Sequence, residues 1–211
     1  MKLTKAFAVL GIPELELFDT VFNPEGQTAG AFLADFLFRT PTLYRGLKLL
    51  DLGCGSGILG IICRMRGAAN VCFSDVNPDA AANARANIER LGLTNTAVRC
   101  GNLFDPWTSH RFDLVVFNSP GKEGCAADMI QLQTVCPPEV VERFYETAPR
   151  FLESDGKLLV ATSTLRDPAR SPVVLAPRFG YAVSVIWERT TPRATQYAIL
   201  LEPEGGQAAP A

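Results

Sequence analysis

The sequence predicts an α/β protein with a Rossmann-like, doubly wound and mostly parallel sheet, an antiparallel C-terminal edge and a single domain. From residue 47 onward, short apolar segments alternate with segments of helical periodicity, which is the pattern of βαβ units. The 211-residue length gives room for one substantial core, and hydrophobic residues make up 47% of the chain. These observations favour one folded unit over two.

The expected elements follow in order along the chain. An amphipathic helix over 28–38 precedes the sheet. The expected strands cover 47–52, 71–74, 96–99, 113–117 and 157–162, and the helices cover 58–66, 80–91, a segment opened by Pro137-Pro138-Glu139, and 171–178. Segments 181–187 and 196–201 alternate in polarity, so we expect them to pair antiparallel at one edge of the sheet.

A glycine-rich turn follows the first strand and indicates the ligand class. Gly53, Gly55 and Gly57 have no Cβ, so a ligand can lie against the main chain there. The next helix directs its positive end toward the same place. Asp51 closes the strand, and its carboxylate repels a diphosphate but attracts an ammonium group. This combination suits an amino-acid-bearing nucleoside, S-adenosylmethionine.

The same turn also fits the dinucleotide pattern G-x-G-x-x-G. Gly55-Ser-Gly57-Ile-Leu-Gly60 satisfies it, and Asp75 lies at about the spacing expected for a ribose-binding acid. Asp51 argues against a dinucleotide. So does Asn118-Ser119-Pro120 after a later strand, because hydride transfer needs no such motif. Cys54 is interpreted as a small side chain that fits the turn, although a thiol at a helix N-terminus can be reactive.

Three further positions close expected strands, where doubly wound sheets bind their ligands. Asp75 can accept hydrogen bonds from two ribose hydroxyls, or else cap a helix for which Asn77 is better placed. Asn102 and the Leu103 N–H can meet an adenine edge, or else form a turn. The Asn118 amide and the Ser119 carbonyl can accept hydrogen bonds from a substrate NH₂, although Asn-Ser-Pro-Gly is also a turn sequence.

Together these residues resemble the class I S-adenosylmethionine-dependent methyltransferases, and more narrowly the single-domain HemK-like (methyltransferase small domain) N-methyltransferases. The resemblance covers residues 21–201. It rests on five short matches: Val21-Phe22-Asn23-Pro24 with Thr28, Asp51 with its glycine loop, Asp75-Val-Asn-Pro-Asp, Asn102-Leu103, and Phe112-Asp-Leu-Val-Val-Phe-Asn118. The family's Asn-Pro-Pro-Tyr is here Asn118-Ser119-Pro120-Gly121, so the aromatic ring that stacks on a planar substrate is missing.

The resemblance implies an enzyme that transfers a methyl group from S-adenosylmethionine to a nitrogen of a protein side chain or a small molecule. It assigns a catalytic role to Asn118, Ser119 and Pro120. The implied cofactor-binding residues are Thr28, Asp51, Gly53, Cys54, Gly55, Gly57, Asp75, Asn102, Leu103 and Asn118. The alternatives are a metabolite N- or O-methyltransferase, a non-catalytic S-adenosylmethionine-binding subunit, and a nicotinamide dehydrogenase. Residues 1–45 are expected to cover the cofactor site, 46–202 to form the methyltransferase domain, and 203–211 to be a disordered tail.

Composition sets the remaining expectations. Lys and Arg (20) nearly balance Asp and Glu (22), which argues against a nucleic-acid partner. No apolar run approaches the ~20 residues that span a bilayer, so we expect no membrane partner. The chain has six cysteines without a C-x-x-C pair and one histidine, His110, which indicates a reduced, cytoplasmic setting without a metal site. The expected partners are the methyl acceptor and, for a non-catalytic protein, a partner subunit.

Overall fold

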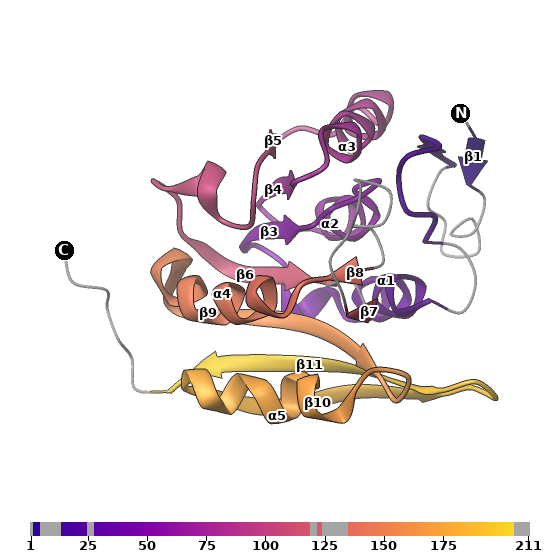
Figure 1. The fold of residues 1–211 in the computed structure, drawn as a ribbon. Coiled ribbons are helices and arrows are strands. Elements are labelled where there is room, and N and C mark those ends of the chain that lie inside the picture. Colours follow the sequence, from indigo (N-terminus) through magenta and orange to yellow (C-terminus); the bar gives the residue numbers. More distant parts are fainter. Residues whose placement is uncertain (1, 5–13, 25–27, 119–121, 124–134, 205–211) are drawn as a thin grey trace.

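The computed structural model describes residues 2–4, 14–24, 28–118, 122–123 and 135–204, which form a three-layer α/β structure (Figure 1). The central sheet has seven strands in the order β10-β11-β9-β6-β3-β4-β5. Its strands are β3 (Lys48–Leu52), β4 (Asn70–Asp75), β5 (Thr96–Cys100), β6 (Phe112–Phe117), β9 (Leu152–Ser163), β10 (Tyr181–Thr190) and β11 (Thr195–Pro203). The strands from β5 to β9 pair in parallel, and β11 and β10 complete the sheet as an antiparallel hairpin. The predicted fold class is confirmed.

Helices cover both faces of this sheet, and short strands lie outside it. The α-helices are α1 (Ala29–Arg39), α2 (Ile58–Met65), α3 (Pro78–Arg90), α4 (Pro138–Thr147) and α5 (Pro172–Leu175). The 3₁₀ turns are Pro41–Leu43, Asp105–Trp107, Ala148–Phe151, Pro168–Arg170 and Ala176–Phe179. Two small sheets join β1 (Lys2–Thr4) to β2 (Leu15–Leu17) and β7 (Lys122–Glu123) to β8 (Val135–Cys136). One core lies between the sheet and α1, α2 and α3, and the other lies under α4 and α5.

Some expected boundaries are wrong, and β9 for example begins at Leu152 instead of residue 157. The helix expected over 171–178 is a single α-helical turn followed by a 3₁₀ turn. Pro177 interrupts it, because proline supplies no backbone N–H to continue the helix. Pro203, expected to begin the tail, is instead the last residue of β11 and pairs with Tyr181, while residues 205–211 lie outside the described residues, so the disordered tail stays a prediction. The division of the chain after residue 45 stays a prediction.

Gly60 allows α2 to pack closely on the sheet. A Cβ at this position would lie 2.3 Å from the ring of Phe73 on β4, which no side chain could tolerate without moving the helix. The missing side chain therefore brings the start of α2 down onto the carboxyl ends of β3 and β4. This approach places the glycine turn where the parallel strands end.

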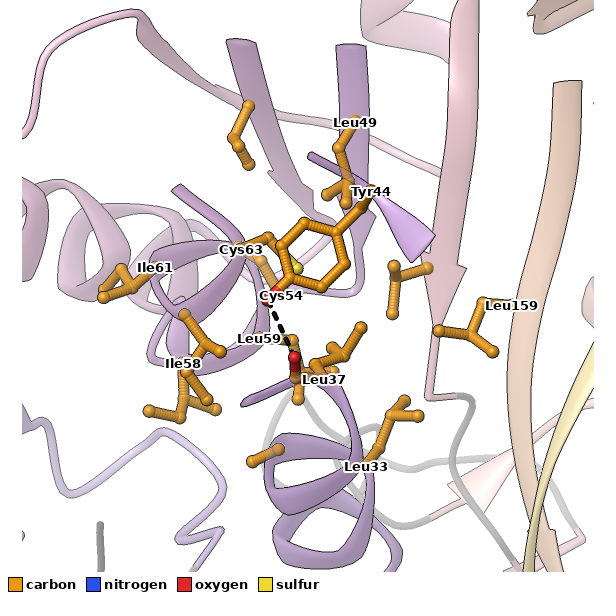
Figure 2. Close-up of a cluster of buried hydrophobic side chains, with 14 of the residues drawn as sticks. Leu33, Leu37, Tyr44, Leu49, Cys54, Ile58, Leu59, Ile61, Cys63 and Leu159 are labelled. Atoms are coloured by element: carbon orange, nitrogen blue, oxygen red, sulfur yellow. Dashed lines mark hydrogen bonds between the residues drawn. The ribbon is translucent and has the colours of Figure 1, made fainter. Parts of the chain in front are cut away.

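Tyr44 seals the opposite, amino end of the core between α1 and α2 (Figure 2). Its buried hydroxyl donates a hydrogen bond to the Leu37 carbonyl at 2.7 Å, and burial raises the pKa of the phenol well above its usual value. We expect Tyr44→Phe to lower the free energy of unfolding by about 1–3 kcal/mol, because the buried carbonyl loses its partner. Urea unfolding measures this, and an unchanged midpoint at an unchanged slope would contradict it.

Candidate functional site

The candidate site lies at the carboxyl edge of the parallel strands, where the sequence placed it. Asp51 is the second-to-last residue of β3, Asp75 ends β4, Asn102 follows β5 and Asn118 follows β6. These strands are neighbours in the sheet, so their carboxyl ends meet at one edge (Figure 1). The fold brings four predicted site residues together that are far apart in sequence.

Asp51 is an almost fully buried carboxylate, 1% exposed, beside the start of α2. Its Oδ2 accepts a hydrogen bond from the Gly60 N–H at 2.8 Å, whereas Oδ1 has no partner among the described residues. Burial raises the pKa of this carboxyl to about 7, the Gly60 hydrogen bond opposes the shift, and the charge of Asp75 adds to it. A buried oxygen without a partner costs stability, so this atom fits a ligand that brings a positively charged donor.

Several backbone N–H groups of the glycine turn donate hydrogen bonds to other groups of the protein. Gly53 and Cys54 both donate to the Ser74 carbonyl, at 2.8 and 3.0 Å, and Gly57 donates to the Cys54 carbonyl. Gly55 donates to Asp75 Oδ2 at 3.0 Å. A diphosphate site depends on free N–H groups at a helix N-terminus. Here five N–H groups between residues 53 and 60 are occupied, two of them by carboxylates, and this disfavours the dinucleotide alternative.

The three predicted turn glycines nevertheless have the conformation that a glycine supplies. Gly53, Gly55 and Gly57 all have positive φ, at 66°, 53° and 84°. A ligand bound at the turn would meet missing side chains rather than free N–H groups of these residues, and the cofactor-binding role of the glycines stays a prediction. The Cys54 side chain points into the apolar core (Figure 2), and burial raises the pKa of its thiol well above the usual value. The structure thus agrees with the interpretation of Cys54 as a packing residue.

Asp75 braces the turn and still has free acceptor capacity. Its Oδ1 accepts from the Asn77 N–H at 2.9 Å, while Oδ2 holds Gly55. Burial raises the pKa of this carboxyl, and the N–H groups of Asn77, Gly55 and Val76 oppose the shift. Asn77 caps α3 by accepting from the Asp79 N–H, as expected. Each carboxylate oxygen of Asp75 can accept a second hydrogen bond, so the ribose role stays a prediction.

The turn after β5 holds its backbone in an unusual conformation. Leu103 has a φ of 48°, which a leucine seldom adopts, and its side chain is buried. Asn102 is exposed, and its carbonyl accepts from the Asp105 N–H at 3.0 Å. Such strain is often found at functional sites, and it fixes the direction of the Leu103 N–H. The adenine-binding role of both residues stays a prediction.

Asn118 faces the helix α1 on the same side of the sheet as Asp51. Asp51 pairs with Val116, whose side chain is on the same face, and Asn118 lies two residues after Val116, just past the end of β6. Asn118 Nδ2 is 3.3 Å from where a Cβ on Gly30 would lie, and Asn118 Oδ1 has no partner among the described residues. Since nothing in the described part of the chain occupies this amide oxygen, it can accept a hydrogen bond from a bound molecule. Ser119, Pro120 and Gly121 lie outside the described residues, so their predicted role stays a prediction.

Thr28 stands beside Asn118 but uses its hydroxyl locally. It caps α1 by accepting from the Ala31 N–H at 3.0 Å and donates to the Pro24 carbonyl at 3.0 Å. The hydroxyl lies 3.7 Å from the same position above Gly30 that Asn118 approaches. The structure thus brings Thr28 to the acceptor end of the site, and a contact with the cofactor stays a prediction.

Sequence reasoning missed two buried asparagines next to this site. Asn83 and Asn87 on α3 are both 0% exposed and bind the backbone of residues 16–18. Asn87 also donates to the Ser56 carbonyl in the glycine turn at 3.0 Å. Their signal in the sequence is their place on the buried stripe of α3, among Ala80, Ala84 and Ile88.

A family model described as methyltransferase small domain matches residues 27–188 of the chain. The chain belongs to this family. The predicted family and its methyltransferase class are confirmed, and S-adenosylmethionine is the cofactor of such enzymes, as the pairing of Asp51 with the glycine turn predicted. The buried Asp51 Oδ1 has no partner among the described residues and could accept from the ammonium group of that cofactor, and this role stays a prediction.

The relatives of this chain are named for different methyl acceptors. The chain is 30% identical over 112 residues to the electron transfer flavoprotein beta subunit lysine methyltransferase of Rattus norvegicus, covering 53% of this chain and 42% of that protein. It is 32% identical over 114 residues to the ribosomal protein L11 methyltransferase of Bacteroides fragilis, covering 51% and 39%. It is 33% identical over 123 residues to ribosomal RNA small subunit methyltransferase C of Hamiltonella defensa, covering 57% and 33%. The chain spans about two fifths or less of the length of these curated relatives.

Solved structures share the fold of this methyltransferase family member. A methyltransferase from Pyrococcus furiosus matches with a TM-score of 0.66 at 18% identity, covering 94% of this chain and 92% of that one. A 16S rRNA methyltransferase from T. thermophilus, solved with AdoMet and guanosine, matches with a TM-score of 0.64 at 20% identity, covering 85% and 44%. The expectation of no nucleic-acid partner is not supported, because relatives include ribosomal RNA methyltransferases. No described helix is both long and apolar enough to cross a bilayer.

Proposed function

We propose that the protein is an S-adenosylmethionine-dependent methyltransferase that methylates a nitrogen atom held at Asn118. The observation that carries this proposal is a pair of buried oxygens, Asp51 Oδ1 and Asn118 Oδ1, which have no partner within the described part of the chain and lie at the carboxyl ends of the adjacent strands β3 and β6. One suits a cationic group, and the other suits a neutral N–H donor. Donor and acceptor would therefore be bound at the same edge of the sheet.

The chain's own residues would bind and orient the reactants. Asp51 would hold the ammonium group of the donor, Asp75 its ribose, and the turn after Asn102 its adenine. When bound, the cofactor supplies an electrophilic methyl group on a sulfonium. Asn118 would accept a hydrogen bond from the acceptor nitrogen and direct its lone pair, and orientation of this kind is a large part of the barrier in such displacements.

The acceptor would be a nitrogen of a protein or of RNA. The names of the relatives support both, since one methylates a lysine and another ribosomal RNA. The missing aromatic residue at Gly121 separates the chain from enzymes that stack a planar glutamine amide.

The test combines binding with methyl transfer. Calorimetry should show binding of S-adenosylhomocysteine and none of NAD. Purified protein given radiolabelled S-adenosylmethionine and the protein and RNA fractions of a cell extract should label one of them, with protease and nuclease digestion telling which. Mild alkali removes methyl esters, and chromatography of the hydrolysed product beside N-methyl and O-methyl standards should place the remaining label with an N-methyl standard. Binding of NAD alone, or no binding of S-adenosylhomocysteine, would overturn the proposal.

A further inference from the structure

Two asparagines on α3 join the N-terminal segment to the glycine turn. Asn83 and Asn87 are four residues apart, so they lie on one face of the helix. Both are 0% exposed. Burying an amide is costly unless its hydrogen bonds are made, so two adjacent buried amides indicate a specific partner. That partner is the N-terminal strap, residues 15–24.

Asn87 binds the strap as a neighbouring strand would. Its Oδ1 accepts from the Glu16 N–H at 2.7 Å, and its Nδ2 donates to the Glu16 carbonyl at 2.9 Å. The same Nδ2 donates to the Ser56 carbonyl at 3.0 Å. One amide therefore links the strap, α3 and the glycine turn.

Further contacts fix the strap along the first half of α3. Asn83 accepts from the Phe18 N–H at 3.1 Å and donates to the Glu16 carbonyl at 2.9 Å. The Asn77 amide donates to the Thr20 carbonyl at 3.2 Å, and the Thr20 hydroxyl donates to Asp79 Oδ2 at 2.7 Å. Leu17 and Val21 of the strap pack against Ala80. These contacts set the position of residues 16–21 relative to the helix.

From there the strap passes along the candidate site. The Val21 side chain lies 4.0 Å from where a Cβ on Gly55 would be. Pro24 and Asn118 both approach Gly30, and the Thr28 hydroxyl donates to the Pro24 carbonyl. The strap thus lies beside the glycine turn at Val21 and beside the surroundings of Asn118 at Pro24.

We infer that Asn83 and Asn87 are positioning residues for methyl transfer, because they hold the strap against the glycine turn as one wall of the donor site. The inference rests on the proposed function. The strap would enclose the methyl donor. Asn118 would not depend on the strap for its position, because it follows β6. Loosening the strap should therefore weaken donor binding more than it slows the reaction at saturating donor.

Asn87→Asp tests this inference without removing the side chain. The carboxylate can still accept from the Glu16 N–H. It cannot donate to the Glu16 and Ser56 carbonyls, so both of those hydrogen bonds are lost. We expect about a 10-fold weaker affinity for S-adenosylhomocysteine and a similar rise in KM for S-adenosylmethionine, with kcat within about 3-fold of wild type. Asn83→Ala keeps every Asn87 contact and should show the same split at about 3-fold.

Tyr44→Phe is the matched control, because it removes a buried hydrogen bond at the opposite end of the core. At equal loss of thermal stability it should bind S-adenosylhomocysteine like wild type. Hydrogen exchange at the Glu16 and Phe18 amides reports whether the strap is released. Faster exchange in Asn87→Asp and Asn83→Ala with unchanged donor affinity would overturn the inference, as would unchanged exchange. Failure of the wild-type protein to bind S-adenosylhomocysteine would instead overturn the proposed function.

Discussion

Asp51→Asn is expected to weaken binding of S-adenosylhomocysteine by about 30-fold or more. The carboxylate is buried, and Asp51 Oδ1 has no other partner among the described residues, so the ammonium group of the ligand would lose its counter-charge. Removing one member of a buried, hydrogen-bonded charge pair costs about 2 kcal/mol or more. Asparagine can still accept from the Gly60 N–H, so the turn should keep its shape. Calorimetry at pH 8 measures the change.

The same substitution is expected to stabilise the unliganded protein at pH 8. The pKa of Asp51 is about 7 in the folded chain against 3.8 for an accessible aspartate, so the folded state binds more protons between about pH 4 and 7. Its contribution to the free energy of unfolding therefore falls as pH rises through this window, and the penalty is complete above pH 7. Asparagine cannot ionise, and we expect a gain of about 1–3 kcal/mol. Thermal unfolding with and without ligand separates the two effects.

Wild-type affinity should in turn fall below pH 7, as the carboxyl takes up its proton, and the affinity of the variant should not follow. Asp113→Asn is the matched control, since this carboxylate lies at the amino end of β6 and accepts from the Lys48 N–H. It should leave affinity unchanged. An Asp51→Asn protein that binds as tightly as wild type would contradict the assignment of Asp51, and with it the electrostatic argument for the donor.

Much of the fold could be predicted because the local signals agreed with the tertiary structure. The parallel strands are short and apolar, and helix caps such as Asn77-Pro78 and Gly92 stand between them. The hydrophobic periodicity and the capping residues therefore predict the same elements. The start of β9 was missed. Its first residues, Leu152 to Gly156, contain charges and a glycine that are typical of a turn, yet they continue the strand across a register shift against β6.

The candidate site was predictable where function depends on residues at strand ends, and not where it depends on long-range hydrogen bonds. Asp51, Asp75 and Asn118 stand at or next to such ends, as their positions in the sequence predicted, and their roles stay predictions. Asn83 and Asn87 sit inside an alanine-rich helix, where asparagine is usually a solvated residue. Only the folded chain shows that their partners are backbone groups between 31 and 71 residues away. The N–H groups of the glycine turn likewise donate to Ser74 and Asp75 of β4. Hydrophobic periodicity does not show that β4 lies next to this turn.

Asn118→Ala is expected to reduce kcat by about 100- to 1000-fold with little change in affinity for S-adenosylhomocysteine. The amide is proposed to orient the acceptor, and losing one such hydrogen bond at a reacting centre has effects of this size. The protein should not become less stable, because Asn118 Oδ1 has no partner to lose among the described residues. Single-turnover methyl transfer to the labelled acceptor, together with thermal unfolding, measures both.

Two comparisons make this result specific. Asn118→Asp keeps an accepting oxygen and should retain more activity than Asn118→Ala, whereas Asn70→Ala, at the exposed amino end of β4, should behave like wild type. A protein that binds S-adenosylhomocysteine but keeps its biological role in the Asn118→Ala form would be a non-catalytic cofactor-binding subunit instead. If Asn118→Ala loses methyl transfer but keeps donor binding and stability, the lost function is the positioning of the acceptor. The packing of α1 and β6 around Gly30 would then be unchanged.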